Sequence, residues 1–407
     1  MKRYFRICTG LSDACLVDDL LRAQNFSFSE LSFWGRAREL EFAPVSLGSS
    51  LAAFFGLIYI QDKSSMLPPL ALQPASGGLV LDMCASPGSK TGMLSAMVGD
   101  SGLVLANEPT PSRLNVLRRN MQHQGAVNVI SCGFKGEDLP LADAGVPYIL
   151  VDVPCSGWGT EEKHPGIRNF WSEDRLGPLL DVQKRLLASA ARLLAPGGRL
   201  VYSTCTTNAR ENEEQVNWAL RHLDLLPAPI DSPAGVPHEN RDEQNFFRVD
   251  SVKNESQGFF VAAFLKKGER CPARPDESLV SPVMHAGLEA FFRDLESKNE
   301  LFSVNKKIFR VPGRIKELFG DNSFQGAYLG KVNKKGYQGC SRLRETIPRD
   351  FESEKGVVFD NIRDLTGLVR GQSLVAPIHS GPCPIYWKGL PLGWARAKNG
   401  RLLWTEK

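Results

Sequence analysis

YILVDVPCSGWG, residues 148–159, reads as an apolar strand followed by a carboxylate and a cysteine, Asp152 and Cys155. YSTCT, residues 202–206, ends a second apolar strand in a similar way, at Cys205. In an open α/β sheet, ligands bind at the carboxyl ends of the strands. The two stretches therefore predict that two thiols and one carboxylate meet at the rim of a sheet, where a ligand binds.

Strands alternate with helices on both sides of these stretches. We expect strands at 79–83, 103–107, 127–131, 148–153, 199–204 and 258–265, and helices at 112–124 and 179–194. Gly125 and the APGG of 195–198 follow the two helices, as glycine often does at helix ends. Such alternation is typical of a doubly wound parallel sheet in an α/β protein.

The composition of the chain suggests four parts. Residues 1–75 read as a small N-terminal α/β segment, and 76–268 hold the alternating strands and helices. Residues 269–287 are polar and contain prolines, which indicates a linker. Residues 288–407 are rich in glycine and in short apolar runs, so we expect a small β-rich domain.

Bulk properties exclude several classes of protein. No apolar run in the 407 residues is long enough to span a bilayer, and the N-terminus lacks the pattern of a signal peptide. We therefore expect a cytoplasmic protein, and a monomer. The nine cysteines form no CxxC pair, which argues against a disulfide framework and a metal site. The net charge of +4 permits a nucleic-acid partner without requiring one.

The loop CASPGSK, residues 84–90, joins the first strand of the alternation to a helix. A glycine in such a turn lets backbone N–H groups approach a cofactor closely. Glu108 ends the next strand, where nucleoside-binding sheets place a carboxylate for ribose hydroxyls. Since the GxGxxG pattern is absent, S-adenosylmethionine fits better than NAD. An ordinary strand–helix turn is the alternative.

Two thiols beside a carboxylate suit chemistry on a pyrimidine base. Carbon C5 of cytosine is a poor nucleophile, but addition of a thiolate to C6 allows C5 to attack an electrophilic methyl group. Asp152 would support the added electron density by hydrogen bonding to the base. The chemistry alone leaves open which thiol attacks, Cys155 or Cys205. The alternative is that each cysteine is a small buried residue.

Three motifs resemble those of the NOL/NOP/Sun family of RNA cytosine-C5 methyltransferases: DMCASPGSKT, VDVPCSGWGT and YSTCT. GLIYIQDKSSMLPP, LANEPTPSRLNVLRRN and KGLPLGWARAKNGRL are similar to its bacterial 16S ribosomal RNA branch. The likeness is strong over residues 55–265 and weaker at either end. It implies a Rossmann-like class I methyltransferase fold with a PUA-like domain at the C-terminus, and methylation of a cytosine in RNA.

The resemblance also implies roles for particular residues. Cys205 would be the nucleophile and Cys155 would help release the product, while Asp152 would face both base and cofactor. The residues expected around S-adenosylmethionine are Cys84, Ala85, Ser86, Pro87, Gly88, Ser89, Lys90, Glu108 and Asp152. Lys135 stands where the family commonly has an acidic residue near adenine, so either Asp138 takes over or adenine is held differently.

The C-terminal region carries a basic stretch that suits RNA. Residues 305–344 contain ten lysines and arginines with interleaved aromatic residues. Basic side chains neutralise phosphates and aromatic rings stack on bases, although a solvated basic surface is the alternative. The family's PUA-like domain favours RNA binding here, and residues 1–75 are expected to contribute. Two other functions remain open: a non-catalytic RNA-binding assembly factor, and the same chemistry on tRNA.

Overall fold

The structure is a computed structural model that describes residues 2–161, 166–172, 175–231, 236, 238–240, 246–269, 295, 300–311, 324–334, 336–349, 356–376 and 378–405. Nearly all of the predicted linker at 269–287 lies outside these residues, as do three of the ten basic residues of 305–344: Arg314, Lys316 and Lys335.

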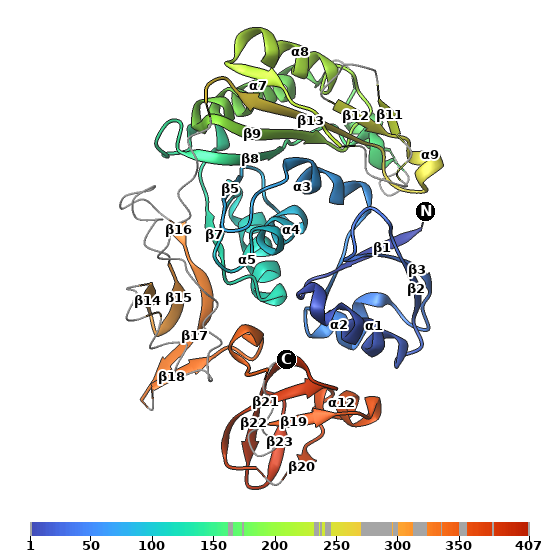
Figure 1. The fold of residues 1–407 in the computed structure, drawn as a ribbon, viewed down its shortest axis with the longest axis vertical. Coiled ribbons are helices and arrows are strands. Elements are labelled where there is room, and N and C mark those ends of the chain that lie inside the picture. Colours follow the sequence, from blue (N-terminus) through green and yellow to red (C-terminus); the bar gives the residue numbers. More distant parts are fainter. Residues whose placement is uncertain are drawn as a thin grey trace.

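A large mixed sheet lies in the upper half of Figure 1, and its central five strands are parallel. These strands are β5 (Leu79–Asp82), β6 (Leu103–Asn107), β7 (Val129–Cys132), β8 (Val146–Asp152) and β9 (Leu194–Thr204), in the order β9-β8-β5-β6-β7. The chain first builds outward from β5 through β6 to β7, and then returns to β8 on the other side of β5. The carboxyl ends of β5 and β8 are therefore a topological switch point, where ligands bind in such sheets.

Antiparallel strands, which the sequence did not predict, extend the parallel sheet at both edges. β13 (Phe259–Lys266) runs antiparallel to β9, and β10 (Leu225–Pro227), β11 (His238–Asn240) and β12 (Phe246–Val249) extend that edge in antiparallel pairing. β16 (Phe324–Gln325) lies antiparallel to β7 at the other edge. Apolar runs such as GFFVAAFL carry no information about direction, because both pairings bury the same side chains.

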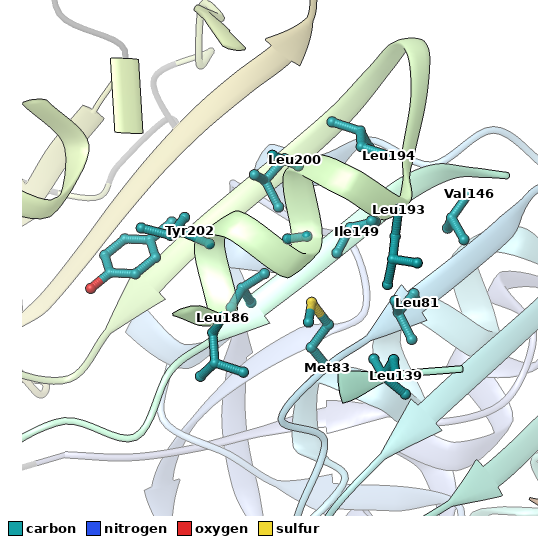
Figure 2. Packing of buried hydrophobic residues seen from close by; sticks show 14 of the residues in the cluster. Leu81, Met83, Leu139, Val146, Ile149, Leu186, Leu193, Leu194, Leu200 and Tyr202 are labelled. Atoms are coloured by element: carbon teal, nitrogen blue, oxygen red, sulfur yellow. The ribbon is translucent and has the colours of Figure 1, made fainter. Parts of the chain in front are cut away.

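Helices cover both faces of this sheet. On one face α7 (Gly177–Leu193) and α8 (Glu213–His222) share a core with alternate strand residues, and Figure 2 shows Leu186 and Leu193 of α7 beside Met83 and Ile149. The other face packs on α3 (Leu67–Leu72), α4 (Ser89–Val98) and α5 (Pro111–Gln124). Two short helices, α6 (Ile167–Phe170) and α9 (Ser251–Asn254), lie in connections. The doubly wound α/β fold is thus confirmed.

The N-terminal segment forms its own antiparallel sheet, β2-β3-β1-β4, with two helices. Its elements are β1 (Arg3–Ile7), α1 (Ala14–Arg22), β2 (Ser27–Glu30), β3 (Ala37–Phe42), α2 (Leu51–Phe54) and β4 (Ile58–Ile60). The fully buried guanidinium of Arg6 donates to the carbonyl of Ser89, 3.3 Å away. This contact ties the N-terminal sheet to the first residue of α4.

The β-rich C-terminal region contains two further sheets. One has the order β14-β15-β17-β18, formed by β14 (Leu301–Val304), β15 (Lys307–Arg310), β17 (Ala327–Asn333) and β18 (Gly336–Gly339). The other has the order β19-β21-β22-β23-β20 beside α12 (Ile362–Val369), with β19 (Val357–Phe359), β20 (Leu374–Val375), β21 (Gly381–Trp387), β22 (Leu390–Lys398) and β23 (Arg401–Leu403).

The last of these sheets shares one hydrophobic core with the N-terminal segment. Phe5 and Leu20 from the start of the chain and Ile385 and Trp387 from its end belong to the same buried cluster. The indole nitrogen of Trp387 also donates to the Asp19 carboxylate, 2.9 Å away. The two ends of the chain therefore pack together, while the domain boundaries drawn from composition stay predictions. Among the described residues, no helix is long and apolar enough to cross a membrane.

Candidate active site

The two cysteines predicted at the sheet rim lie side by side. Parallel pairing of β8 and β9 sets Asp152 opposite Ser203, and Cys155 and Cys205 follow these positions within three residues. Their Sγ atoms are 3.2 Å apart and both thiols are free and partly buried. This distance allows one thiol to donate a hydrogen bond to the other sulfur. The sequence placed both thiols at one edge, and the structure adds that they touch.

A buried glutamate that the sequence reasoning missed holds the loop around Cys155. The Glu211 carboxylate is fully buried and accepts hydrogen bonds from the backbone N–H and hydroxyl of Ser156 and from the amide of Gln183. The Ser156 hydroxyl also lies 2.8 Å from that of Thr206, next to Cys205. The acidic ENEEQ of residues 211–215 predicts the start of a helix, but α8 begins only at Glu213. Glu211 instead fixes the two cysteine loops against each other.

A close backbone approach at Gly159 joins the same loops to β13. Its N–H donates to the carbonyl of Cys205, and its carbonyl accepts from the N–H of Gly258. A Cβ at Gly159 would lie 2.5 Å from the Gly258 oxygen and 2.7 Å from the Cys205 oxygen, so no larger residue fits without movement. The second glycine of SGWG is the sequence signal for this contact.

The two thiols have unequal electrostatic surroundings. The hydrogen bond from Cys155 lowers the pKa of Cys205, an effect that the Lys90 ammonium reinforces and burial opposes. The same hydrogen bond raises the pKa of Cys155, and burial and the Glu211 carboxylate act in the same direction. Cys205 is therefore the thiol more readily ionised, and Cys155 stays protonated beside it.

Asp152 lies between the thiols and the cofactor loop. One carboxylate oxygen is 2.6 Å from the Lys90 ammonium, and the other accepts a hydrogen bond from the Ser203 hydroxyl at 2.7 Å. The Asp152 side chain is 27% exposed, so it can reach a ligand while these two partners hold it. The Lys90 ammonium also lies 5.1 Å from the centre of the Phe259 ring, which limits its movement.

The loop predicted to hold a cofactor is a tight turn. The N–H of Ala85 donates to the Asn107 carbonyl, and that of Gly88 donates to Ala85. Gly88 has a φ of +102° and its Cβ would lie 2.6 Å from the Met121 side chain, so the turn requires glycine. Ser86 and Pro87 accept hydrogen bonds at their carbonyls from Arg113 and Asn120 of α5. Ser89 and Lys90 are the first residues of α4.

The acceptors around this turn suit a ligand that presents hydroxyl and ammonium donors. Glu108 is 2% exposed and one carboxylate oxygen accepts from the Thr110 N–H, while the other lies 3.4 Å from Arg113. Asp82, at the end of β5, has one buried oxygen without a hydrogen-bond partner. Burial raises its pKa to about 7. Acidic groups with spare acceptors are what the ammonium and ribose of S-adenosylmethionine need, so the residues present fit this cofactor.

Three further residues named from the sequence are Cys84, Lys135 and Asp138. Burial raises the pKa of Cys84 well above its usual range, so this third thiol stays neutral. A neutral thiol is consistent with a residue that contributes its backbone to the loop. Lys135 and Asp138 both lie exposed on the turn after β7, and the N–H of Asp138 donates to the carbonyl of Lys135. That Asp138 faces adenine, or that adenine is held differently, stays a prediction. Within the described part of the chain, no three His, Cys, Asp or Glu side chains form a cluster able to hold a metal ion.

A doubly wound sheet with a cofactor turn after β5 and an acidic residue after β6 defines an S-adenosylmethionine-dependent methyltransferase. Residues 69–265 match the profile of the family described as 16S rRNA methyltransferase RsmB/F. The chain is 32% identical over 333 residues to the ribosomal RNA small subunit methyltransferase F of Aliivibrio fischeri, across 76% of this chain and 69% of that protein. It is 34% identical over 383 residues to that of Klebsiella pneumoniae, across 88% and 78% of the two chains.

A solved structure of similar fold is a methyltransferase homolog protein from Pyrococcus horikoshii. It has a TM-score of 0.56 and 34% identity, over 65% of this chain and 87% of that one. Together with the relatives, it shows that this chain belongs to the 16S rRNA methyltransferase RsmB/F family. The expected family, class of fold, enzyme activity and cofactor are thereby confirmed.

The unequal pKa values of the thiols predict a pH effect. In Cys155→Ala the hydrogen bond to Cys205 is lost, so the pKa of Cys205 should rise and its alkylation by iodoacetamide should need a higher pH than in the wild type. Mass spectrometry of the Cys205 peptide across a pH series measures this shift. Exposed Cys15 serves as the internal reference, because it lies outside the site. An unchanged or lower pH midpoint for Cys205 would contradict the argument.

The contacts of Glu211 predict a positioning role. Glu211→Ala leaves two buried N–H groups and a hydroxyl without their acceptor, so we expect unfolding free energy to fall by roughly 3 kcal/mol. Because the Cys155 loop shifts, turnover should fall by about a hundredfold while the KM for S-adenosylmethionine stays within about twofold. Urea unfolding and steady-state kinetics measure both. The control is Glu214→Ala, an exposed glutamate three residues on, and equal behaviour of the two variants would refute the role.

Proposed function

We propose that this protein transfers a methyl group from S-adenosylmethionine to C5 of a cytosine in 16S ribosomal RNA, through a covalent adduct between Cys205 and C6 of the base. One observation carries the proposal: two free thiols of unequal acidity lie 3.2 Å apart beside the Asp152–Lys90 pair. Membership of the family supports the substrate, since the relatives are named for small-subunit ribosomal RNA.

Cys205 begins the reaction. Its thiolate forms a bond to C6, and the electron pair of the C5–C6 double bond moves toward N3 of the ring, where a hydrogen bond from the Lys90 ammonium stabilises it. S-adenosylmethionine supplies an electrophilic methyl group on a sulfonium. With the cofactor bound, C5 would form a bond to that methyl as the methyl–sulfur bond breaks and the sulfonium becomes a neutral thioether. The bound base would then carry both a proton and a methyl group at C5.

Cys155 completes the reaction. While Cys205 is a thiolate, the hydrogen bond between the two sulfurs raises the pKa of Cys155. Adduct formation turns Cys205 into a neutral thioether, so this cause disappears and Cys155 ionises more easily. Cys155 can then take the proton from C5, the C5–C6 double bond re-forms, and Cys205 leaves as a thiolate. The hydrogen bond thus sets the order of the two steps.

The contacts of the site favour an enzyme over a non-catalytic assembly factor, which would not need paired thiols next to a cofactor turn. Methylation of tRNA would use the same residues, so the test includes both RNAs. A monomer acting in the cytoplasm is part of the proposal, because the residues assigned to catalysis come from one chain and ribosomal RNA is the substrate.

The first test is loss of the nucleophile. Cys205→Ala should abolish transfer of labelled methyl to 16S ribosomal RNA, because no other ionised thiol lies against the base. Cys15→Ala is the control and should behave as the wild type, since Cys15 is exposed and remote from the site. Methyl transfer at the wild-type rate by Cys205→Ala would refute the mechanism. Faster transfer to tRNA than to 16S ribosomal RNA would refute the substrate.

The second test separates attack from release. Cys155→Ala should form the adduct but fail to resolve it, so a protein–RNA species should accumulate in the presence of S-adenosylmethionine. A denaturing gel detects this species by its slower migration. The double variant Cys155→Ala with Cys205→Ala is the control, and it should show none. If the single variant shows no adduct either, Cys155 does not assist release.

A further inference from the structure

A groove lined by basic residues lies between α5 and the sheet that contains β15 and β17, at the edge where β16 joins β7. Figure 1 shows the positions of α5, β16 and β17, which contribute residues to it. It has a volume of about 620 Å³. Four basic residues line it, Arg118, Arg119, Lys307 and Arg342, and its lining of described residues includes no aspartate or glutamate. This excess of positive charge in a concave surface points to an anionic ligand.

Side chains of α5 contact both the groove and the cofactor loop. Ser112, Asn115, Arg119 and Gln122 recur at helical spacing and line the groove. Leu117 and Met121 of the same helix lie against Gly88 of the cofactor loop, and Met121 also lines the groove. One helix therefore separates the cofactor loop from the groove and contacts both.

Two of the four cations that line the groove are available to an anionic ligand. No ion pair within the described ranges involves Arg119 or Lys307, and both side chains are exposed. Lys307 on β15 lies directly opposite Lys331 on β17, and such a pair of like charges is unfavourable unless an anion lies between them. The half-buried Arg118 donates to the Ser131 hydroxyl at 2.9 Å, and burial lowers its pKa. A bound anion would stabilise each of these cations.

We infer that this groove binds the phosphate backbone of the RNA substrate beyond the target cytosine, an inference that rests on the proposed function. Neutral hydrogen-bonding side chains alternate with the cations, among them Asn115, Gln122 and Gln325, and these suit ribose hydroxyls and phosphate oxygens. The groove also lies next to the cofactor loop. Ser112 lines it, and the adjacent Arg113 donates to the Ser86 carbonyl and lies 3.4 Å from Glu108. A strand of RNA leaving the site has a charged path along α5.

The test is charge reversal at the two exposed cations, Arg119→Glu with Lys307→Glu, in the full chain. Binding to a 16S ribosomal RNA transcript is measured over a range of salt, together with the KM for S-adenosylmethionine. We expect at least a tenfold weaker RNA affinity and a salt slope smaller by about 2, because two phosphate contacts are lost. The KM for S-adenosylmethionine and the rate at saturating RNA should stay unchanged. The control is Arg185→Glu with Arg221→Glu, an equal charge change on exposed residues of α7 and α8.

The outcomes separate this inference from the proposed function. Loss of RNA affinity in the groove variant, with the control like the wild type, supports the groove even if no methyl is transferred. Equal RNA affinity in the wild type and the groove variant overturns it, whether or not the wild type methylates RNA. So does an equal loss in the control, which would indicate a general charge effect. Competition by polyglutamate at lower concentration than by RNA would assign the groove to an acidic protein and also overturn it.

Discussion

The parallel pairing of β8 with β9 is the constraint on which the site depends. Its register sets Asp152 opposite Ser203 and brings the two cysteine loops to the same edge of the sheet. A shift of one residue would turn every side chain of a strand to the other face, so the register is fixed by burial of Ile149 and Leu200 in the core beneath. The 3.2 Å contact between the thiols is thus maintained by ordinary hydrophobic packing several residues away.

The buried Glu211 holds the Cys155 and Cys205 loops in place beyond the ends of β8 and β9. A carboxylate without solvent is unfavourable unless its oxygens accept hydrogen bonds. Here three donors from Ser156 and Gln183 satisfy it, and its own backbone carbonyl accepts from the Tyr202 hydroxyl at 2.6 Å. A glutamate can accept from all three donors at once, which explains why a charged residue occupies this place. The Glu211 charge also adds to the Cys205 hydrogen bond and to burial in raising the pKa of Cys155. One carboxylate therefore contributes both to the structure of the loops and to their chemistry.

The sequence predicted the strands, the thiols and the cofactor turn because each depends on local pattern. Apolar runs mark β5 to β9, and a cysteine or carboxylate at the end of a strand must lie at the rim. Glu211 was misread because an acidic residue near a helix start has a sufficient local explanation, and its partner Gln183 is distant in sequence. The common core of Phe5 and Trp387 was missed for a related reason: a hydrophobic pattern shows that a face is buried but not what covers it.

Arginines connect the catalytic sheet to the sheets at either end of the chain. Arg344 donates to the carbonyls of Phe55 at 2.5 Å and of Gln124 at 2.7 Å, so it joins the N-terminal segment to the end of α5. Arg6 donates to the Ser89 carbonyl of α4 and to the side-chain oxygen of Gln124 at the end of α5, 2.6 Å away. The end of α5 is therefore fixed by both sheets, while its first turn holds the cofactor loop through Arg113. Because one helix receives all of these contacts, the terminal regions position the cofactor turn although they lie outside the sheet that carries it.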